Sequence, residues 1–407
     1  MVKTDRSEEI TLIGDAKRLF HENIREWGMY IALLVIMIIF TITTKGVFLS
    51  SRNISNLINQ TGYIAILAIG MTLVIIISHI DLSVGYLSGF LGAVAATAME
   101  FWHMPAPISI ALIIIIGAMA GLLTGFLVGQ MKIPAFVATL AGWLGYRGAL
   151  QLVTMHRGTI VITNDAFNAI GSGYIPDIPI IPDIGIFAGV HKLTLTLGLL
   201  VIIFYIISTV KLRNRMLYRN FKVSPMHLFI LKVIFMSALI GVITWILSGF
   251  RGLSWTAVIV IVVVLFYHFI MARTNLGRHI YAVGGNPEAA QLTGISVKKI
   301  TYIVFCSMGM LAALSGVLYA SRFKSATTTA GTLFELDAIA AAFVGGASPS
   351  GGIGKVTGSI VGAFVMMSLT SGMNLMGIDI SYQYIVRALV LVAAVVFDVA
   401  TRNRKKT

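Results

Sequence analysis

The sequence predicts an all-α polytopic membrane protein, and its composition and hydropathy are the observations that predict it. Of the 407 residues, 57% are hydrophobic and only 11% are charged, and the mean hydropathy is +0.91. A soluble domain carries about a quarter charged residues. Apolar runs long enough to cross a bilayer as helices, about 20 residues each, recur along the chain, and we expect about 10–12 membrane helices.

Twelve apolar segments carry this prediction. They lie near residues 27–44, 54–78, 82–100, 107–130, 134–153, 193–210, 226–249, 254–272, 299–321, 335–346, 354–371 and 383–400. The tenth, 335–346, is too short to cross a bilayer, so we expect a broken or re-entrant helix there. Small residues one turn apart, as in the pairs Gly121/Gly125 and Gly358/Gly362, would let helices pack closely.

The placement of lysine and arginine predicts the orientation. With both termini in the cytoplasm, and with Lys299 and Lys355 at the segment edges counted with the loops, 20 of the 30 lysines and arginines fall in inside loops and 7 in outside loops, which is the bias expected of cytoplasmic loops. The net charge of +14 then reflects loops and contact with anionic lipid, not nucleic-acid binding. The chain is predicted to have three parts: a cytoplasmic amphipathic N-terminus (1–26) without a cleavable signal, a transmembrane domain (27–400) and a basic cytoplasmic tail (401–407). Within the transmembrane domain we expect an external loop at 154–192, a basic cytoplasmic loop at 211–225 and a further cytoplasmic loop at 275–297.

The polar segment 275–294 has the signals of a short, well-defined helix outside the lipid. Asn286 is a good N-cap, Pro287 suits the first helical position, and Glu288 suits the positive end of the helix dipole. Gly294 supplies a stop, and Gly285 is expected to permit a backbone turn that a side chain would hinder. We expect a rigid helix of about two turns on which another protein docks. A well-folded loop without a partner is the alternative.

Motifs of catalysis and metal binding were sought without success. The run Gly351-Gly-Ile-Gly-Lys355 fails as a phosphate-binding loop because Pro349 and Val356 occupy positions that need Gly and Ser or Thr. The histidines form no ligand pair, and Cys306 is the chain's one cysteine, so no disulfide forms within the chain. We therefore expect a protein that is not an enzyme and that holds neither a metal nor a cofactor of its own.

Polar residues within apolar segments are the candidates for a translocation pathway, because such residues are costly in lipid. The candidates are Asn56, Gln60, Asp81, Ser83, Thr139, Trp143 and Asn374. Asp81 is either a helix cap or a pathway residue. Thr139, Trp143 and Arg147 recur every four residues and share one helix face, where Trp143 could offer a stacking surface. Any one of these residues could instead bond between helices.

Several motifs together resemble those of the bacterial monosaccharide permeases of ATP-binding-cassette (ABC) importers. They are Ile80-Asp-Leu-Ser-Val-Gly85, the run 277–295, and Glu335-Leu-Asp-Ala-Ile-Ala340 followed by Gly345-Gly and Gly351-Gly-Ile-Gly354. The likeness covers the chain from about residue 30. Within that family, the chain is most similar to the xylose or multiple-monosaccharide branch, with extra length relative to the ribose type around 211–253.

The resemblance implies a fold and partners that composition alone does not. It implies a transmembrane domain like that of type II ABC importers. It also implies import of a monosaccharide (xylose, arabinose, galactose, glucose or similar) across the cytoplasmic (inner) membrane. The partners would be a second permease copy in a homodimer, an extracytoplasmic sugar-binding protein, and cytoplasmic ABC ATPase subunits that bind the ATP and Mg.

The resemblance also assigns the contact with the ATPase to the segment predicted to dock. The residues concerned are Gly277, Arg278, Tyr281, Gly284, Gly285, Asn286, Pro287, Glu288, Ala289, Ala290 and Gly294. A self-contained secondary sugar carrier or channel is the alternative function. A carrier would need ion-coupling residues in the middle of the membrane, and the sequence offers few.

The charge bias makes a prediction about topology. In a Cys306→Ala background, a membrane-impermeant thiol reagent added to intact cells should label Ser172→Cys but neither Ser224→Cys nor Thr407→Cys. Labelling of Ser224→Cys from outside would mean that the spans between 193 and 272 are paired wrongly.

Overall fold

A computed structural model describes residues 24–178, 189–219, 221, 223 and 225–403. The predicted segment before residue 24, the middle of the 154–192 loop, parts of the 211–225 loop and the tail after residue 403 lie outside the described residues. Each of the twelve apolar segments forms a helix, which confirms the all-α prediction. The helices are α2 (Ile24–Thr43), α3 (Ser51–Ile76), α4 (Val84–Glu100), α5 (Ala106–Gly129), α6 (Ala135–Thr154), α8 (Lys192–Tyr218), α9 (Met226–Ser248), α10 (Trp255–Arg273), α13 (Val297–Phe323), α14 (Phe334–Val344), α15 (Val356–Leu375) and α16 (Ile380–Asn403).

Length and apolarity identify the helices that could cross a membrane. Within the described residues, seven helices are long and apolar enough to do so: α3, α5, α8, α9, α10, α13 and α15. Shorter apolar stretches lie at Gly28–Thr43, Val84–Glu100 and Ile380–Val396. Helix α14 has only 11 residues and follows a non-helical turn, so the prediction of a helix too short to span is confirmed.

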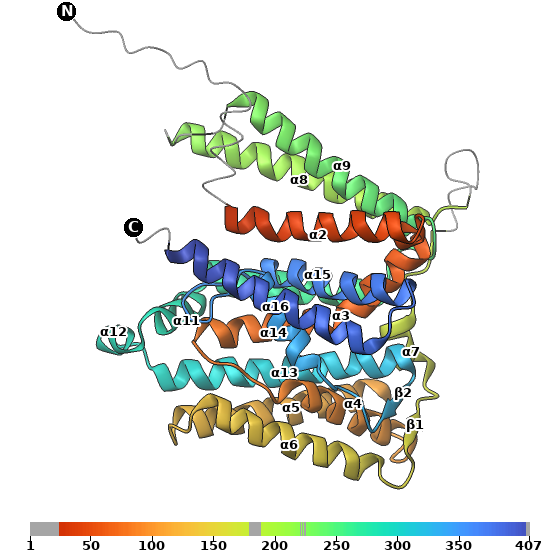
Figure 1. Ribbon diagram of the computed structural model, residues 1–407, viewed down its shortest axis with the longest axis vertical. Coiled ribbons are helices and arrows are strands. Elements are labelled where there is room, and N and C mark those ends of the chain that lie inside the picture. The colour runs from red at the N-terminus through yellow and green to blue at the C-terminus, as the bar shows by residue number, and fades with distance from the viewer. Residues whose placement is uncertain (1–23, 179–188, 220, 222, 224, 404–407) are drawn as a thin grey trace, which may run out of the picture.

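The loops contain structure that the sequence did not predict. Helix α7 (Asp165–Ser172) lies in the external loop, and the short helix η1 (Val47–Leu49) precedes α3. Strand β1 (Thr159–Val161) pairs antiparallel with β2 (Ser325–Thr327), with Ile160 opposite Ala326. This pairing ties the external loop to the end of α13. Figure 1 shows α7 and both strands at one end of the helix bundle, whereas α12 and the C-terminal end of α16 lie at the other.

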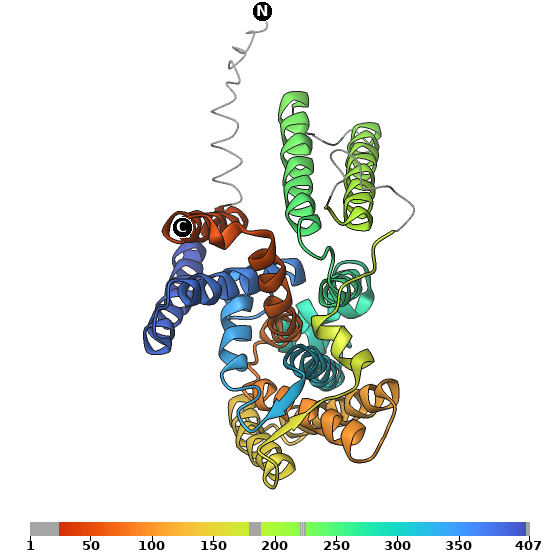
Figure 2. The ribbon, with the colours of Figure 1, turned by 90° about the vertical axis from the view of Figure 1, so that its right-hand side faces the viewer.

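Helices α3 and α13 form the centre of the bundle. Helix α13 packs against α3, α4 and α5, and α3 also contacts α14 and α15. Helices α8 and α9 pair with each other and stand apart from the other helices (Figure 2). Their side chains remain exposed, as at Phe204 (72%) and Leu231 (59%), which suits helices that face lipid.

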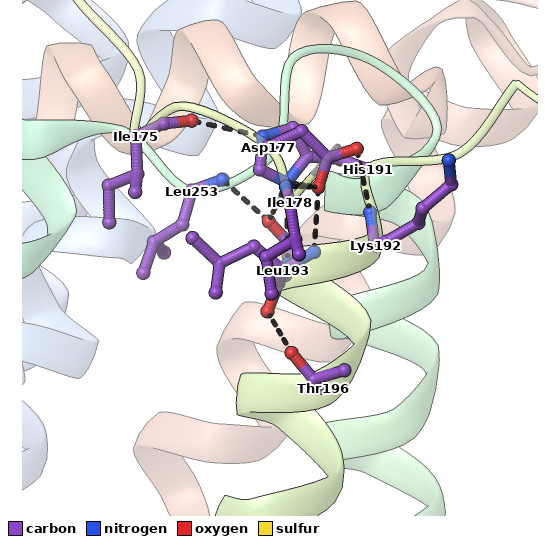
Figure 3. A network of polar contacts seen from close by, with 9 residues as sticks. Ile175, Asp177, Ile178, His191, Lys192, Leu193, Thr196 and Leu253 are labelled. Atoms are coloured by element: carbon purple, nitrogen blue, oxygen red, sulfur yellow. Dashed lines mark hydrogen bonds and ion pairs between the residues drawn. The ribbon is translucent and has the colours of Figure 1, made fainter. Parts of the chain in front are cut away.

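The start of α8 is held by an acidic cap on the external side. The carboxylate of Asp177 accepts hydrogen bonds from the backbone amides of Lys192 (3.1 Å) and Leu193 (2.8 Å), as Figure 3 shows. The slight burial of Asp177 by itself would raise the pKa of its carboxyl. The backbone amides of Leu193, Lys192 and Ile178 and the nearby His191 outweigh this effect and lower that pKa. The carboxylate is therefore charged at neutral pH, at the positive end of the helix dipole. This cap attaches the α8–α9 pair to the external loop.

Glycine allows the central helices to touch backbone to backbone. A Cβ at Gly121 of α5 would overlap the carbonyl oxygen of Phe305 in α13, and one at Gly362 of α15 would overlap that of Ala341 in α14. A Cβ at Gly358 would overlap the carbonyl oxygen of Gly345 in the same way, whereas one at Gly125 would have slightly more room, 3.1 Å from the Cα of Tyr302. Both predicted small-residue pairs therefore lie at helix contacts.

This packing predicts how single methyl groups act. Gly121→Ala should lower the thermal unfolding midpoint of the purified protein in detergent, because overpacking costs about 1–3 kcal/mol and exceeds the gain in helix propensity. The matched control is Gly145→Ala in α6, where a Cβ meets nothing within 4 Å. Equal midpoints for the two variants would contradict the backbone contact.

Candidate functional site

The segment predicted to dock forms two short helices, α11 (Asn275–Gly285) and α12 (Pro287–Leu292). The predicted cap is confirmed: Asn286 accepts a hydrogen bond from the amide of Ala289 (3.0 Å), and Pro287 occupies the first position. Gly294 has a φ of 85° and ends the segment, as expected. The sequence analysis missed α11, whose N-cap is the hydroxyl of Thr274.

Helix α11 interlocks with two loops at the same end of the bundle. A Cβ at Gly284 would overlap the carbonyl oxygen of Ile76, the last residue of α3. The hydroxyl of Tyr281 donates a hydrogen bond to the carbonyl oxygen of Gly354 (2.7 Å). The backbone amide of Gly352 donates one to the carbonyl oxygen of Ile76 (2.8 Å). The end of α3, helix α11 and the turn before α15 are therefore joined through backbone groups.

The expectation about Gly285 is wrong. Its φ lies outside the left-handed region, and a Cβ there would meet nothing within 4 Å. The position that requires glycine is the preceding one, Gly284. The sequence gives no means to choose between two adjacent glycines, because the group that fixes the choice, Ile76, is more than 200 residues away in the chain.

The predicted docking residues divide into an anchoring set and an exposed set. Gly277, Gly284 and Ala290 are buried and Tyr281 is half-buried, whereas Arg278, Gly285, Asn286, Pro287, Glu288, Ala289 and Gly294 are exposed. Leu292, which the sequence analysis did not single out, is 90% exposed at the end of α12. An apolar side chain held out on a polar, rigidly attached helix is suited to contact with another protein.

A polar cavity of about 580 Å³ opens at the opposite end of the bundle, which the charge bias predicts to be external. It is lined by Arg52, Asn56, Asn59, Ser172, Tyr174, Phe250, Arg251, Arg322 and Phe323. Asn56 is the one pathway candidate among them, and Gln60 lies one turn further along α3. The three arginines could not be predicted to meet here, because Arg52 of α3, Arg251 of a loop and Arg322 of α13 lie far apart in the chain.

Four other pathway candidates make structural contacts instead. Asp81 is buried and accepts hydrogen bonds from the amide (2.9 Å) and hydroxyl (2.6 Å) of Ser83, the N-cap residue of α4, so it supports the turn that leads into this helix. Thr139 is fully buried and donates to the carbonyl of Ile80 (3.4 Å). Asn374 accepts from Gln383 of α16 (2.8 Å). The candidates therefore do not form one site.

Trp143 contacts a carboxylate that the sequence analysis did not assign. Its indole N–H donates to Oε1 of Glu335 (3.0 Å), and its ring meets that of Tyr86 edge to face at 5.0 Å. The guanidinium of Arg147 lies 5.6 Å from the ring centre of Trp143 and 5.8 Å from that of Tyr86. The predicted face of α6 therefore contacts α4 through Tyr86 and α14 through Glu335.

A second buried carboxylate on α14 is paired with a cation. Asp337 forms an ion pair with Arg387 of α16 at 3.3 Å, and Arg387 also donates to the hydroxyl of Thr370 in α15 (2.8 Å). This pair joins three helices. Asp337 therefore has a structural partner that neutralises it.

Comparison with known proteins gives a consistent result. Residues 53–174 and 184–395 match the family described as branched-chain amino acid transport system / permease component. The xylose transport system permease protein XylH of Haemophilus influenzae is 38% identical over 385 residues, which cover 94% of this chain and 98% of that protein. The ribose import permease protein RbsC of Escherichia coli K12 is 34% identical over 368 residues, which cover 90% and 92%. No solved structure matches the chain.

The contact at Gly284 leads to a prediction about the two adjacent glycines. Gly284→Ala should push α11 away from the end of α3, and trypsin should then cleave the purified protein faster at Arg273 and Arg278. Gly285→Ala, with open space around its Cβ, should be cleaved like the unmodified chain. Identical cleavage of both variants would mean that α11 is not held at Ile76.

Proposed function

The chain belongs to the family of branched-chain amino acid transport system / permease components, and from that premise we propose that it is the permease subunit of an ATP-driven ABC importer for a monosaccharide. The relatives named for xylose and ribose align over 94% and 90% of this chain, which favours a sugar over an amino acid. It is a multi-pass protein of the cytoplasmic (inner) membrane and a transport subunit, not an enzyme.

The feature that carries the proposal is the capped helix pair α11–α12, which the charge bias predicts to lie on the cytoplasmic side. Helix α11 packs against the end of α3 and is hydrogen-bonded to the turn before α15, and Leu292 and Glu288 are exposed. Such a rigid, exposed surface supports docking of cytoplasmic ABC ATPase subunits, which would bind the ATP and Mg. The permease itself would hold no cofactor.

The opposite end supports the delivery of sugar from an extracytoplasmic binding protein. The external cavity is lined by amide, hydroxyl, aromatic and guanidinium groups. These groups can exchange hydrogen bonds with water for hydrogen bonds with sugar hydroxyls at small net cost. Asn56 and Gln60 would then lie at the entrance of the pathway. A second permease copy would complete the assembly as a homodimer in the lipid bilayer.

The alternative, a self-contained carrier or channel, is less well supported. The relatives are named as permease components of import or transport systems. Of the two buried carboxylates on α14, Asp337 is already paired with Arg387. A carrier would also have no use for the anchored helices at its cytoplasmic end.

The role of α12 is tested by charge inversion at its exposed first turn. Glu288→Lys should leave membrane insertion intact, because loss of the dipole interaction costs only about 0.3–1 kcal/mol. With the binding protein and ATPase present, ATP hydrolysis should no longer drive import in reconstituted vesicles. Glu288→Gln, which removes the charge without inverting it, should retain more import. Normal sugar-stimulated hydrolysis and uptake in Glu288→Lys would contradict docking at α12.

A further inference from the structure

Glu335 is a buried carboxylate with only one of its oxygens occupied. The residue is 4% exposed in the first turn of α14. Oε1 accepts the indole N–H of Trp143, whereas Oε2 is buried and has no hydrogen-bond partner among the described residues. A buried polar atom without a partner is costly, and such atoms in folded proteins are nearly always satisfied. Oε2 therefore lacks a donor that the described part of the chain could supply.

Glycines hold this carboxylate in place. A Cβ at Gly85 of α4 would overlap Oε2 of Glu335, and one at Gly89 would overlap the carbonyl oxygen of Ala330. Gly331, with a φ of 83°, in turn touches the carbonyl of Gly85. The turn before α14 therefore lies directly on α4, and the Glu335 side chain has little freedom to turn away.

Two aromatic rings and a cation lie next to the carboxylate. Tyr86 is 6% exposed, Trp143 is half-buried, and Arg147 is exposed above both rings. The exposure thus increases from the carboxylate outward. A carboxylate acceptor beside aromatic rings suits a polyol, whose hydroxyls donate hydrogen bonds and whose C–H face packs on a ring.

The cluster lies within the helix bundle and next to an exposed polar turn. Trp143 is in the middle of α6, and Glu335 follows a non-helical turn in which Thr328, Thr329 and Thr332 are exposed. Non-helical backbone at membrane depth is tolerated only where protein covers it or water reaches it. We therefore expect this turn to face water or protein and not lipid, in contrast to α8 and α9.

We propose that Glu335, Trp143, Tyr86 and Arg147 form a sugar-binding station within the pathway, in which Oε2 of Glu335 accepts a hydrogen bond from a sugar hydroxyl. The station rests on the proposed function, because it needs a monosaccharide as cargo. Its sugar contacts are separate from the external cavity, which Asn56 and Arg322 line. In this proposal Glu335 determines sugar specificity within the permease itself, separately from the binding protein.

The first test asks whether water reaches this surface. In the Cys306→Ala background, Thr332→Cys and Leu336→Cys should react with a charged thiol reagent, and D-xylose delivered by the loaded binding protein should slow the reaction. The control is Phe204→Cys on α8, which is exposed but faces lipid and should not react. Unreactive Thr332→Cys and Leu336→Cys, or reactivity equal to that of Phe204→Cys, would overturn the station. This test leaves Glu335 unchanged and so does not depend on a Glu335 variant folding.

The second test removes the acceptor. In vesicles with the ATPase and saturating loaded binding protein, Glu335→Gln should lower D-xylose import about tenfold or more, as expected for loss of a buried hydrogen bond to a charged group. One monodeoxy analogue of xylose should be imported slowly by the unmodified chain, and Glu335→Gln should no longer distinguish it from xylose. Glu100→Gln, the same change at an external cap that binds Thr163, should import xylose normally.

The outcomes separate the two proposals. If the unmodified chain imports no sugar with its partners, the proposed function fails and the station fails with it. Two results would overturn the station alone, provided that the unmodified chain imports xylose. In the first, Glu335→Gln imports xylose equally well; in the second, it slows xylose and every analogue by the same factor. Glu335 would then be a helix contact.

Discussion

Direct contact between helix backbones is the constraint on which the rest of this structure depends. Lipid is as apolar as leucine, so the helices gain little by hiding apolar side chains and must associate through close packing. Glycine makes that possible, since a Cβ at Gly121, Gly309 or Gly362 would overlap a carbonyl oxygen of the neighbouring helix. These contacts place α13 at the centre. Helices α8 and α9, which lack most of them, stay at the periphery (Figure 2).

Backbone contacts of the same kind fix the non-helical breaks between helices in place. The end of α3 meets Gly284 of α11, and the amide of Gly352 donates to the carbonyl of Ile76. Asp81 satisfies the amide of Ser83 at the start of α4. Backbone groups that a break would leave unpaired in a low-dielectric interior are thus satisfied locally. The docking helices are consequently attached to the central helices without a flexible linker.

The sequence was sufficient for the local features and insufficient for the long-range ones. Hydropathy located all twelve helices, and the order Asn286-Pro287-Glu288 located the start of α12, because these signals depend on neighbouring residues. Contacts between residues far apart in the chain could not be predicted from it. Trp143 and Glu335 are 192 residues apart, and the choice of Gly284 over Gly285 depends on Ile76. The pathway candidates were chosen without such long-range information: in the structure Thr139 bonds to the turn before α4, and Asn374 bonds to Gln383 of α16.

Helix α14 connects the two ends of this arrangement. Residues two apart on a helix point roughly 200° from each other, so Glu335 faces α4 and α6 while Asp337 faces Arg387 of α16. At its other end, Gly345 rests on Gly358 of α15, and the following turn reaches Tyr281 through Gly354. A short helix fixed at both ends cannot shift at one end without displacing the other. The buried carboxylates of α14 and the helices α11 and α12 are therefore parts of one connected framework rather than separate features of a bundle.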